Sequence, residues 1–589
     1  MLYNVKTNPL QQYYIIRENV MKYEKSAKER PLASLKELLL SGAELFGDKN
    51  AFLIKKEKAG DYHEVSYNRL KEDTEALGTS LLEMGLSGEK IALIGANCYQ
   101  WVVAYLACVC TGNIIVPLDK ELSRQEIQNL LNAAGCKAAF FTEEYRESFK
   151  ESGIEKHFLI SVYEDESEKN QSNHILGLIE EGKKLINAGD ISFNKADPDP
   201  SKMCAILFTS GTTDMPKGVM LSQKNIAFVI ENTSKIVSLR EDDTALSILP
   251  IHHTFECTMG IMEVLYQGGC IAFCEGLKYV VKNMQESKTS LLVGVPLIVE
   301  ALHEKIWKQA NKTGKDKKLK AAVNVNKTLM TLGIDKRRTI FKSVYAGFGG
   351  RFRMVICGAA ALDPAALRGF IDLGLEIVQG YGLTETAPLV AGTPEWENIY
   401  KKAGSTGKVI PGGELKIDDP DEEGIGEILY KGDNVMLGYY NMPEKTAEVI
   451  KDGWFYTGDL GFIDEEGWLY ITGRKKNVIV TKTGKNIYPE ELEALLKEIP
   501  EVKDALVYGE EVSPSGDTMI SAQLLLDEEV IQETMKDTND KEKIKEYIEE
   551  KVYEINKKIP IYKKIRGIMI REEDFIRTTT KKIKRQANI

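Results

Sequence analysis

The sequence lacks the features that mark several large protein classes. Its longest apolar stretch, Trp101 to Cys110, is too short to span a bilayer. The first residues, Met1 to Lys6, contain no apolar core of a signal peptide. The nine cysteines are odd in number and form no CxxC pair, which argues against a disulfide framework. These absences predict a protein of the reducing cytoplasm.

An excess of positive charge is also missing. The net charge of -11 argues against general nucleic-acid binding and favours solubility. Hydrophobic residues make up 43% of the chain and charged residues 28%, as in ordinary globular proteins. Because 589 residues exceed the size of one typical domain, we expect at least two domains.

Short apolar strands alternate with helical patterns in the N-terminal part of the chain. Strands are expected at residues 90–95, 113–118 and 137–141, and helices at 101–110 and 123–134. This alternation is typical of a mostly parallel sheet with helices on both faces. Ligands bind at the carboxyl ends of the strands in such sheets.

One polar loop follows an apolar run, Ala205 to Phe208, that is expected to form a strand. The loop contains four hydroxyl side chains, two glycines and a lysine: Thr209, Ser210, Gly211, Thr212, Thr213, Lys217 and Gly218. Backbone N–H groups, hydroxyls and a lysine suit a phosphate group, and glycine lets the backbone approach it. The spacing is not that of a Walker A loop. A polar surface turn is the ordinary alternative.

Two adjacent histidines, His252 and His253, follow the expected strand at 245–249. Adjacent side chains are expected to point in different directions, and no Cys or His partner lies at ligand spacing. We therefore expect no metal site here. A hydrogen-bonded histidine at a strand end is the alternative to a functional one.

The loop at Thr209 resembles the phosphate-binding signature of the adenylate-forming superfamily, which includes acyl-CoA synthetases, luciferases and adenylation domains of peptide synthetases. Asp214 stands where the family usually has glycine. Further segments that resemble family motifs follow in order, at 357–362, 380–386, 426–439, 454–459 and 473–476. The resemblance extends from about Leu35 to the C-terminus.

The resemblance implies an α/β fold with two domains. The first, residues 1–472, would consist of layered, mostly parallel sheets with helices. A hinge at 473–476, in which Lys476 falls at the family's hinge position, would lead to a small α+β mobile domain at 477–589. In relatives, the glycine turn that matches Gly484 lines the CoA tunnel.

The resemblance also assigns the adenine and phosphate contacts to two turns. The matching residues are Gly358, Ala359 and Ala360 in the first turn and Gly380, Tyr381, Gly382, Thr384 and Glu385 in the second. Tyr381 would stack on the purine, Thr384 would donate to the α-phosphate, and Glu385 would bind Mg²⁺. A flat aromatic ring, a hydroxyl and a hard carboxylate oxygen suit these three roles.

The remaining site residues come from other family motifs. Asp459 and Arg474 would contact the ribose, and His253 would lie beside the carboxylate substrate. Lys582 matches the lysine that reaches this carboxylate in relatives. Lys581 replaces the usual glycine before it, so the neighbouring lysine is an alternative.

The segment from Glu304 to Lys342 is rich in positive charge. It contains only three acidic residues, Glu304, Asp316 and Asp335, and twelve basic ones: Lys305, Lys308, Lys312, Lys315, Lys317, Lys318, Lys320, Lys327, Lys336, Arg337, Arg338 and Lys342. An insertion at this place resembles long-chain fatty acyl-CoA synthetases. Such a patch can contact the anionic inner face of a membrane. A solvated helical hairpin is the alternative.

The resemblance implies that the protein activates a long-chain fatty acid with ATP and Mg²⁺ and then transfers it to CoA, the co-substrate. Two alternatives remain open. One is a fatty acyl-AMP ligase or an enzyme that loads an acyl carrier protein. The other, from a different class, is a non-catalytic protein that binds nucleotide or acyl chains.

Overall fold

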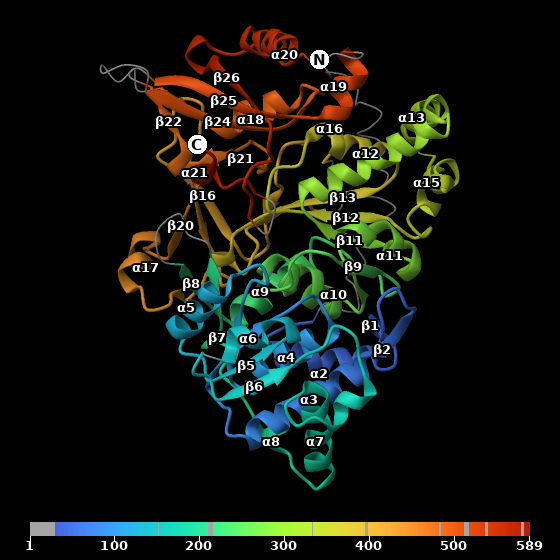
Figure 1. The fold of residues 1–589 in the computed structure, drawn as a ribbon, viewed down its shortest axis with the longest axis vertical. Helices are drawn as coiled ribbons and strands as arrows, with labels where there is room; N and C mark the ends of the chain where they lie inside the picture. Colours follow the sequence, from blue (N-terminus) through green and yellow to red (C-terminus); the bar gives the residue numbers. More distant parts are fainter. Residues whose placement is uncertain are drawn as a thin grey trace, which may run out of the picture. The chain divides into compact units, whose positions relative to one another are not determined.

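The computed structural model describes residues 30–150, 152–209, 216–332, 334–394, 399–481, 485–511, 518–535, 540–578 and 582–589. The chain divides into two compact units (Figure 1). Unit 1 comprises the residues up to Glu414 together with Lys431–Phe455. Unit 2 comprises Leu415–Tyr430 and Tyr456–Ile589.

A seven-stranded sheet in unit 1 carries the polar loop. Its order is β18-β8-β7-β4-β3-β5-β6, and the strands from β7 to β6 are parallel. The bounds are β3 Lys90–Ile94, β4 Ile114–Pro117, β5 Ala138–Phe141, β6 Lys156–Leu159, β7 Met203–Thr209, β8 Lys217–Ser222 and β18 Gly438–Tyr439. The strands expected at 90–95, 113–118 and 137–141 are confirmed. The antiparallel addition of β8 and β18 is not visible in the sequence pattern.

A nine-stranded sheet forms the second layer of strands in unit 1, in the order β15-β14-β13-β12-β11-β9-β10-β1-β2. The six strands from β13 to β1 are parallel. The bounds are β1 Asn50–Lys55, β2 Tyr62–Ser66, β9 Thr244–Ser247, β10 Cys270–Phe273, β11 Leu291–Gly294, β12 Met354–Cys357, β13 Glu376–Tyr381, β14 Ala391–Gly392 and β15 Lys408–Val409. The carboxyl ends of β9, β11, β12 and β13 therefore meet at one edge.

Helices connect these strands. Their bounds in unit 1 are α2 Leu35–Phe46, α3 Tyr67–Glu83, α4 Tyr99–Cys110, α5 Arg124–Ala134, α6 Arg146–Lys150, α7 Ile175–Asn187, α8 Ser192–Lys195, α9 Gln223–Thr233, α10 Glu263–Tyr266, α11 Val280–Ser287, α12 Pro296–Lys312, α13 Asp316–Thr331, α14 Arg337–Ile340, α15 Lys342–Ala346, α16 Pro364–Asp372 and α17 Pro443–Val449. Short 3-10 turns are η1 Glu143–Tyr145, η2 Glu166–Asn170, η4 Leu277–Tyr279 and η5 Thr384–Thr386, and η3, Phe255–Met262, is a π-helix.

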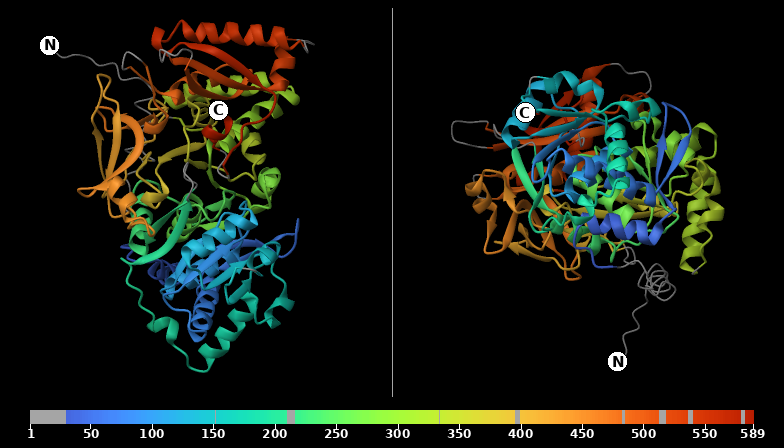
Figure 2. Two further views of the ribbon diagram at one scale, coloured as in Figure 1. Left: turned by 60° about the vertical axis from the view of Figure 1, so that its left-hand side comes forward. Right: turned by 90° about the horizontal axis from the view of Figure 1, so that it is seen from below.

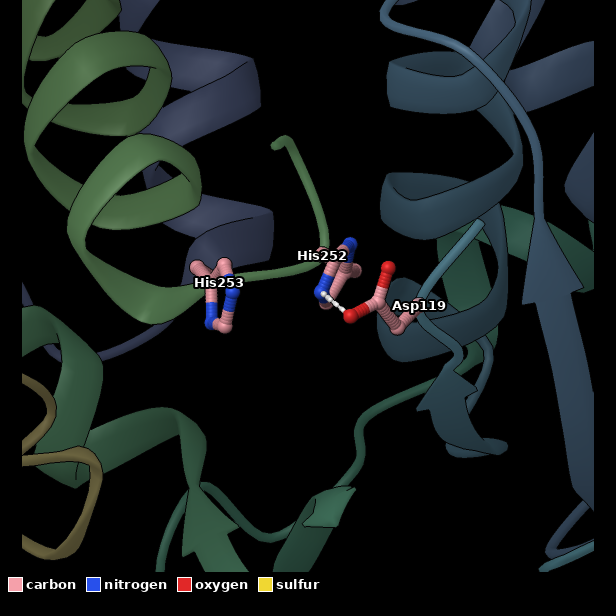
Figure 3. A group of neighbouring side chains, drawn as sticks. All are labelled: Asp119, His252 and His253. Atoms are coloured by element: carbon pink, nitrogen blue, oxygen red, sulfur yellow. Dashed lines mark ion pairs between the residues drawn. The ribbon is translucent and has the colours of Figure 1, made fainter. Parts of the chain in front are cut away.

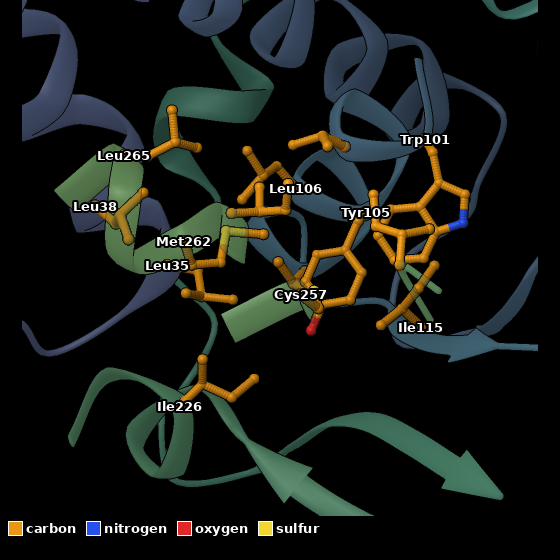
Figure 4. Close-up of a cluster of buried hydrophobic side chains, with 14 of the residues drawn as sticks. Leu35, Leu38, Trp101, Tyr105, Leu106, Ile115, Ile226, Cys257, Met262 and Leu265 are labelled. Atoms are coloured by element: carbon orange, nitrogen blue, oxygen red, sulfur yellow. The ribbon is translucent and has the colours of Figure 1, made fainter. Parts of the chain in front are cut away.

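The helix α4 lies in the interior of unit 1. All twelve of its residues are buried, because its sequence offers no polar face to water. Figure 4 shows Trp101, Tyr105 and Leu106 of α4 in one cluster with side chains such as Leu35 of α2 and Met262 of η3. This buried helix is part of the rigid core of unit 1 that supports the loops of the site.

The helix α5 begins as its sequence predicts. The Ser123 side chain accepts from the N–H of Glu126, and the Glu126 carboxylate accepts from the N–H of Ser123. This capping box satisfies two backbone donors that a helix start leaves without intrahelical partners.

Unit 2 contains most of a five-stranded sheet and all of a three-stranded sheet. The strands of the first are β16 Glu414–Asp418, β17 Gly426–Lys431, β19 Ile450–Lys451, β20 Trp454–Ile463 and β21 Leu469–Arg474. The others are the pair β22 Ile479–Val480 and β23 Asn486–Ile487, then β24 Val502–Glu511, β25 Thr518–Leu526 and β26 Ile565–Arg571. The helical segments are η6 Lys475–Asn477, α18 Pro489–Lys497, α19 Glu528–Met535, α20 Lys541–Asn556, η7 Ile561–Lys563 and α21 Arg585–Asn588.

The core of the three-stranded part of unit 2 is built by two helices. Leu492 and Leu496 of α18 and Ile548 and Val552 of α20 are buried in one cluster with the strands. In the left view of Figure 2, α20 is the long red helix beside this sheet. The α/β fold class and its small α+β C-terminal part are thus confirmed. The predicted hinge at 473–476 lies inside unit 2.

All nine cysteines are described, and none forms a disulfide. Eight are buried, and Cys274 is half-buried. Among the helices of the described residues, none is long and apolar enough to cross a membrane.

Candidate active site

The two turns predicted to hold adenine lie next to each other in unit 1. Gly358 to Ala360 follow β12, and Gly382 follows β13, which pairs in parallel with β12. Both turns leave the carboxyl edge of the nine-stranded sheet, where ligands of such sheets bind. The structure therefore brings these two predicted segments together.

Neighbouring atoms leave no room for a side chain at Gly358 or Gly382. A Cβ at Gly382 would lie 1.7 Å from the Pro388 carbonyl oxygen, and a Cβ at Gly358 would lie 2.9 Å from the Phe255 ring. Ala359 between them adopts a φ of 71°, in the left-handed region. Ala359 is half-buried and Ala360 is exposed.

The turn that carries Thr384 and Glu385 is held by hydrogen bonds from both sides. The amide of Asn434 donates to the carbonyls of Thr386 (2.7 Å) and Leu389 (2.6 Å). The N–H of Met436 donates to the carbonyl of Glu385 at 2.8 Å. Glu385 is half-buried, so its carboxylate remains within reach of solvent and of a hard cation.

Tyr439 links Glu385 to the phosphate loop. Its hydroxyl donates to Oε1 of Glu385 at 2.9 Å, and Nζ of Lys217 lies 4.9 Å from the centre of its ring. Burial, and next the charge of Glu385, raise the pKa of the Tyr439 phenol. Sequence reasoning assigned no role to Tyr439, although the motif at Gly438–Tyr439 was visible. The pairing of β18 with β8 places it there.

The loop itself is described only at its two ends. Thr209 and Lys217 face each other across the β7–β8 pair, and the Thr209 hydroxyl lies 3.4 Å from the Lys217 carbonyl. Both residues are half-buried. Ser210, Gly211, Thr212 and Thr213 lie outside the described residues.

The adjacent histidines point into the same space, so the expectation that they diverge is wrong. The centres of their rings are 4.2 Å apart, and Nε2 of His252 lies 3.6 Å from Oδ2 of Asp119 (Figure 3). Side chains alternate only along an extended strand. Here β9 ends at Ser247, and the chain turns, with the His253 N–H donating to the Pro250 carbonyl at 3.1 Å. Burial, and next the charges of His253 and Lys120, lower the pKa of His252.

Asn97, which follows β3, holds this histidine turn. Its amide donates to the Leu249 carbonyl (2.6 Å) and to the Ser247 hydroxyl (2.8 Å), and its carbonyl accepts from the Ile251 N–H (3.2 Å). Ser247 in turn contacts Glu256, whose carboxyl group is fully buried. Burial raises the pKa of Glu256 to about 8, so this group is largely neutral at pH 7. Sequence reasoning identified neither Asn97 nor Glu256.

Three predicted residues come together within unit 2. Nε of Arg474 lies 2.6 Å from Oδ1 of Asp459, which is directly opposite it across β20 and β21. Lys582 sits in a tight turn in which the Thr578 N–H donates to the Lys582 carbonyl at 2.8 Å. The surrounding protein, and next the charge of Arg474, lower the pKa of the Lys582 ammonium, and Asp459 opposes this.

The other predicted residues of unit 2 are only partly described. Lys476 lies in η6 and is exposed, and the neighbouring Lys475 pairs with Glu427 at 2.7 Å. Gly484 and Lys581 lie outside the described residues.

Models of known protein families match most of this chain. The model of AMP-binding enzymes matches residues 41–440, which include every predicted site residue of unit 1. The chain belongs to the AMP-binding enzyme family. The C-terminal domain model of this same family matches residues 476–589, which include Lys582.

Curated relatives of this AMP-binding enzyme include human long-chain-fatty-acid–CoA ligase 1, which is 31% identical over 76% of this chain and 68% of the relative. Arabidopsis thaliana long chain acyl-CoA synthetase 5 is 28% identical over 77% of this chain and 72% of the relative. The anthranilate CoA ligase AuaEII, solved with anthranoyl-AMP, shares the fold with a TM-score of 0.74 at 19% identity, over 95% and 96% of the two chains. The o-succinylbenzoate CoA synthetase of Bacillus subtilis, solved with ATP and magnesium, has a TM-score of 0.69 at 20% identity, over 94% of this chain and 99% of that one.

Proposed function

We propose that this AMP-binding enzyme is a long-chain fatty acid–CoA ligase that uses ATP and Mg²⁺. The arrangement of Lys217, Tyr439 and Glu385 beside the phosphate loop is the observation that carries the proposal for ATP. A cationic group and an oriented carboxylate in this arrangement would suit the phosphates and the Mg²⁺ of a bound ATP. The curated relatives named as long-chain ligases support the acyl substrate.

The first half-reaction needs charge compensation rather than a base. The fatty carboxylate is already an anion when it attacks the α-phosphorus of ATP, and pyrophosphate leaves with the electron pair of the broken P–O bond. Lys217 and Lys582 would offset the repulsion between the two anions, and Thr384 would donate to the α-phosphate. The carboxylate of Glu385 fits a hard cation, and Mg²⁺ held there would add charge stabilisation at the phosphates.

The second half-reaction forms the thioester. The thiol of CoA would attack the carbonyl carbon of the acyl-adenylate, lose its proton and release AMP. We propose that the C-terminal domain turns about Lys476 between the two half-reactions, so that Lys582 withdraws and the turn at Gly484 lines the path of CoA. In the nucleotide site, Asp459 and Arg474 would contact the ribose, Gly358–Ala360 would support the purine and Tyr381 would stack on it.

We also propose that the basic segment contacts an anionic membrane surface. In the described part of Glu304–Lys342, eleven of the twelve basic side chains are exposed, and Arg337 is half-buried. Three apolar side chains are exposed in the same segment: Val325 (53%), Leu332 (66%) and Ile334 (42%). Exposed lysines around apolar side chains are typical of surfaces that bind the headgroup region of lipid bilayers.

Pyrophosphate release tests the proposed function. It would be measured with ATP and Mg²⁺ across saturated acids from short to long, with and without CoA. We expect release that rises with chain length and needs CoA for turnover. Release without CoA, with acyl-adenylate accumulating, would instead support an acyl-AMP ligase. No release with any acid would support a non-catalytic binding protein.

The Lys582→Ala variant tests the assigned lysine in the same assay. Losing a charged hydrogen bond of roughly 1.5–3 kcal/mol would slow the first half-reaction about 10- to 150-fold. Lys584→Ala, which changes another exposed lysine of the same segment, is the matched control. Normal activity of Lys582→Ala would refute the assignment, and Lys581 would then be the lysine to replace.

A further inference from the structure

We propose that Asp119, His252 and His253 form a binding site for a divalent transition-metal ion, with Zn²⁺ as the best match, and that an ion bound there inhibits acid activation. This site differs from the Mg²⁺ site proposed at Glu385. The inhibition, but not the binding, rests on the proposed function.

The three side chains each supply one ligand atom to a common cluster. These atoms all lie within 4.8 Å of one another, and His252 Nε2 and Asp119 Oδ2 are 3.6 Å apart. Ligands of a tetrahedral Zn²⁺ with bonds of about 2.0–2.1 Å lie about 3.3 Å apart. The separations of up to 4.8 Å would have to shorten on binding, and Figure 3 shows the His252 ring between the His253 ring and the Asp119 carboxylate.

The ligands come from two backbone segments, each held in place by hydrogen bonds. Asp119 follows β4, and its Oδ1 accepts from the Glu121 N–H at 2.9 Å, which leaves Oδ2 for His252 and the ion. The histidine turn is tied to Asn97 through Ile251 and Leu249. Nε2 of His252 is buried and forms no hydrogen bond within the described residues. A metal ion would give this nitrogen a partner.

The donor set selects the kind of ion. Two imidazoles and one carboxylate are ligands that suit Zn²⁺ and similar ions, and they leave a coordination position open. Mg²⁺ prefers oxygen ligands, so the Mg²⁺ that accompanies ATP would compete poorly. Lys120, the adjacent exposed cation, limits the affinity through its charge.

An ion at this place would affect the acid rather than ATP. His253 is the residue that the family resemblance places beside the carboxylate substrate. An ion bound to His253 would occupy the place of that carboxylate and remove His253 from the substrate, so the ion and the acid would exclude each other. Inhibition is therefore expected to be relieved by more fatty acid and unchanged by more ATP.

Cobalt is the probe for the binding itself. The full-length protein, stripped of metal with a chelator, would be titrated with Co²⁺ in the absence of ATP and acid, and the visible absorption of bound Co²⁺ would be recorded. We expect one ion per chain, displaced by Zn²⁺. Asp119→Asn and His252→Ala should each weaken binding by at least about tenfold. His63→Ala removes an exposed histidine of β2 and should leave binding unchanged.

The outcomes are distinguishable. No stoichiometric Co²⁺ signal, or equal binding by Asp119→Asn and His252→Ala, overturns the site. Thermal unfolding of the metal-free variants shows whether they are folded. If His252→Ala does not fold, the near-isosteric Asp119→Asn variant still tests the site. If Co²⁺ binds and Zn²⁺ does not inhibit pyrophosphate release in competition with the acid, the inhibition is refuted. If no acid releases pyrophosphate, the proposed function fails, and the Co²⁺ result still decides the site.

Discussion

The hydroxyl of Tyr439 donates a 2.9 Å hydrogen bond to the carboxylate of Glu385. Tyr439 reaches Glu385 because β18 extends the seven-stranded sheet, whereas Glu385 follows the nine-stranded one. The bond thus joins the two sheets at the site and fixes the direction of the carboxylate. The raised pKa of Tyr439 keeps its hydroxyl protonated, so it remains a donor at all physiological pH values.

Removal of this donor should weaken the use of Mg²⁺. In Tyr439→Phe the ring stays under Lys217, and the carboxylate of Glu385 loses its fixed orientation. A hydrogen bond to a charged group contributes roughly 1.5–3 kcal/mol, so the Mg²⁺ concentration for half-maximal activity should rise about tenfold or more. The measurement is pyrophosphate release against free Mg²⁺. Tyr440→Phe, one residue along, is the control, and an equal response of both variants would contradict the role of Tyr439.

Replacement of Gly382 should disrupt the turn that carries Glu385. An alanine Cβ would lie 1.7 Å from the Pro388 carbonyl oxygen, so the backbone must move. We expect a loss of stability at the upper end of about 1–3 kcal/mol and a fall in activity larger than the fall in folded protein explains. A Cβ at Gly380 would lie 3.0 Å from the flexible Leu389 side chain, so Gly380→Ala should cause smaller losses of stability and activity. Thermal unfolding and activity would be measured for both variants. Equal losses in Gly382→Ala and Gly380→Ala would contradict the role of Gly382.

Glu256 should make stability depend on pH. Its pKa rises from an ordinary value of 4.5 to about 8, so the folded protein holds a proton that the unfolded chain releases. Because the folded state binds more protons between these values, the free energy of unfolding from this group falls as pH rises from 4.5 to about 8. The slope is at most about 1.4 kcal/mol per pH unit.

Glu256→Gln removes this contribution while keeping a polar group beside Ser247. The melting temperature should therefore fall less between about pH 6 and 8 in the variant than in the wild type. Glu263, another buried carboxyl group with a raised pKa, is present in both proteins and cancels in the comparison. Identical pH profiles would mean that Glu256 is ionised in the folded protein.

Charge reversal in α13 should abolish membrane contact. Lys317, Lys318 and Lys320 are exposed, and each lysine near an anionic surface contributes about 1 kcal/mol. The triple Lys→Glu variant should bind phosphatidylserine-containing vesicles at least about 100-fold more weakly in co-sedimentation. The same change at the exposed Lys541, Lys543 and Lys545 of α20 is the control. Equal binding of wild type and the α13 variant would refute the proposed surface.

The helices and strands that the sequence predicts well are determined by residues close together in the chain. The helix expected at 123–134 and the apolar strands are examples, because burial pattern and helix start are encoded within a few positions. The helix expected at 101–110 begins earlier, at Tyr99, since a boundary depends on what packs against it. The π-helix at Phe255–Met262 is not among the elements that the sequence predicts.

The residues that the sequence does not reveal depend on contacts between distant segments. Tyr439 meets Glu385, Asn97 meets the turn at Leu249, and Asp119 meets His252, and no local pattern encodes such pairs. The assigned roles of Thr384, Asp459 and Lys582 came from motif resemblance. They stay predictions until the nucleotide-dependent reaction is measured.

The burial of the cysteines has a chemical consequence for the proposed reaction. An acyl-adenylate acylates any accessible thiolate, so a reactive cysteine of the protein would compete with CoA and inactivate the chain that made it. Burial raises the pKa of every cysteine, to about 11 for Cys274 and about 12 for Cys98, Cys110 and Cys257. These thiols stay protonated and are poor nucleophiles. The enzyme is thereby protected from modification by its own intermediate.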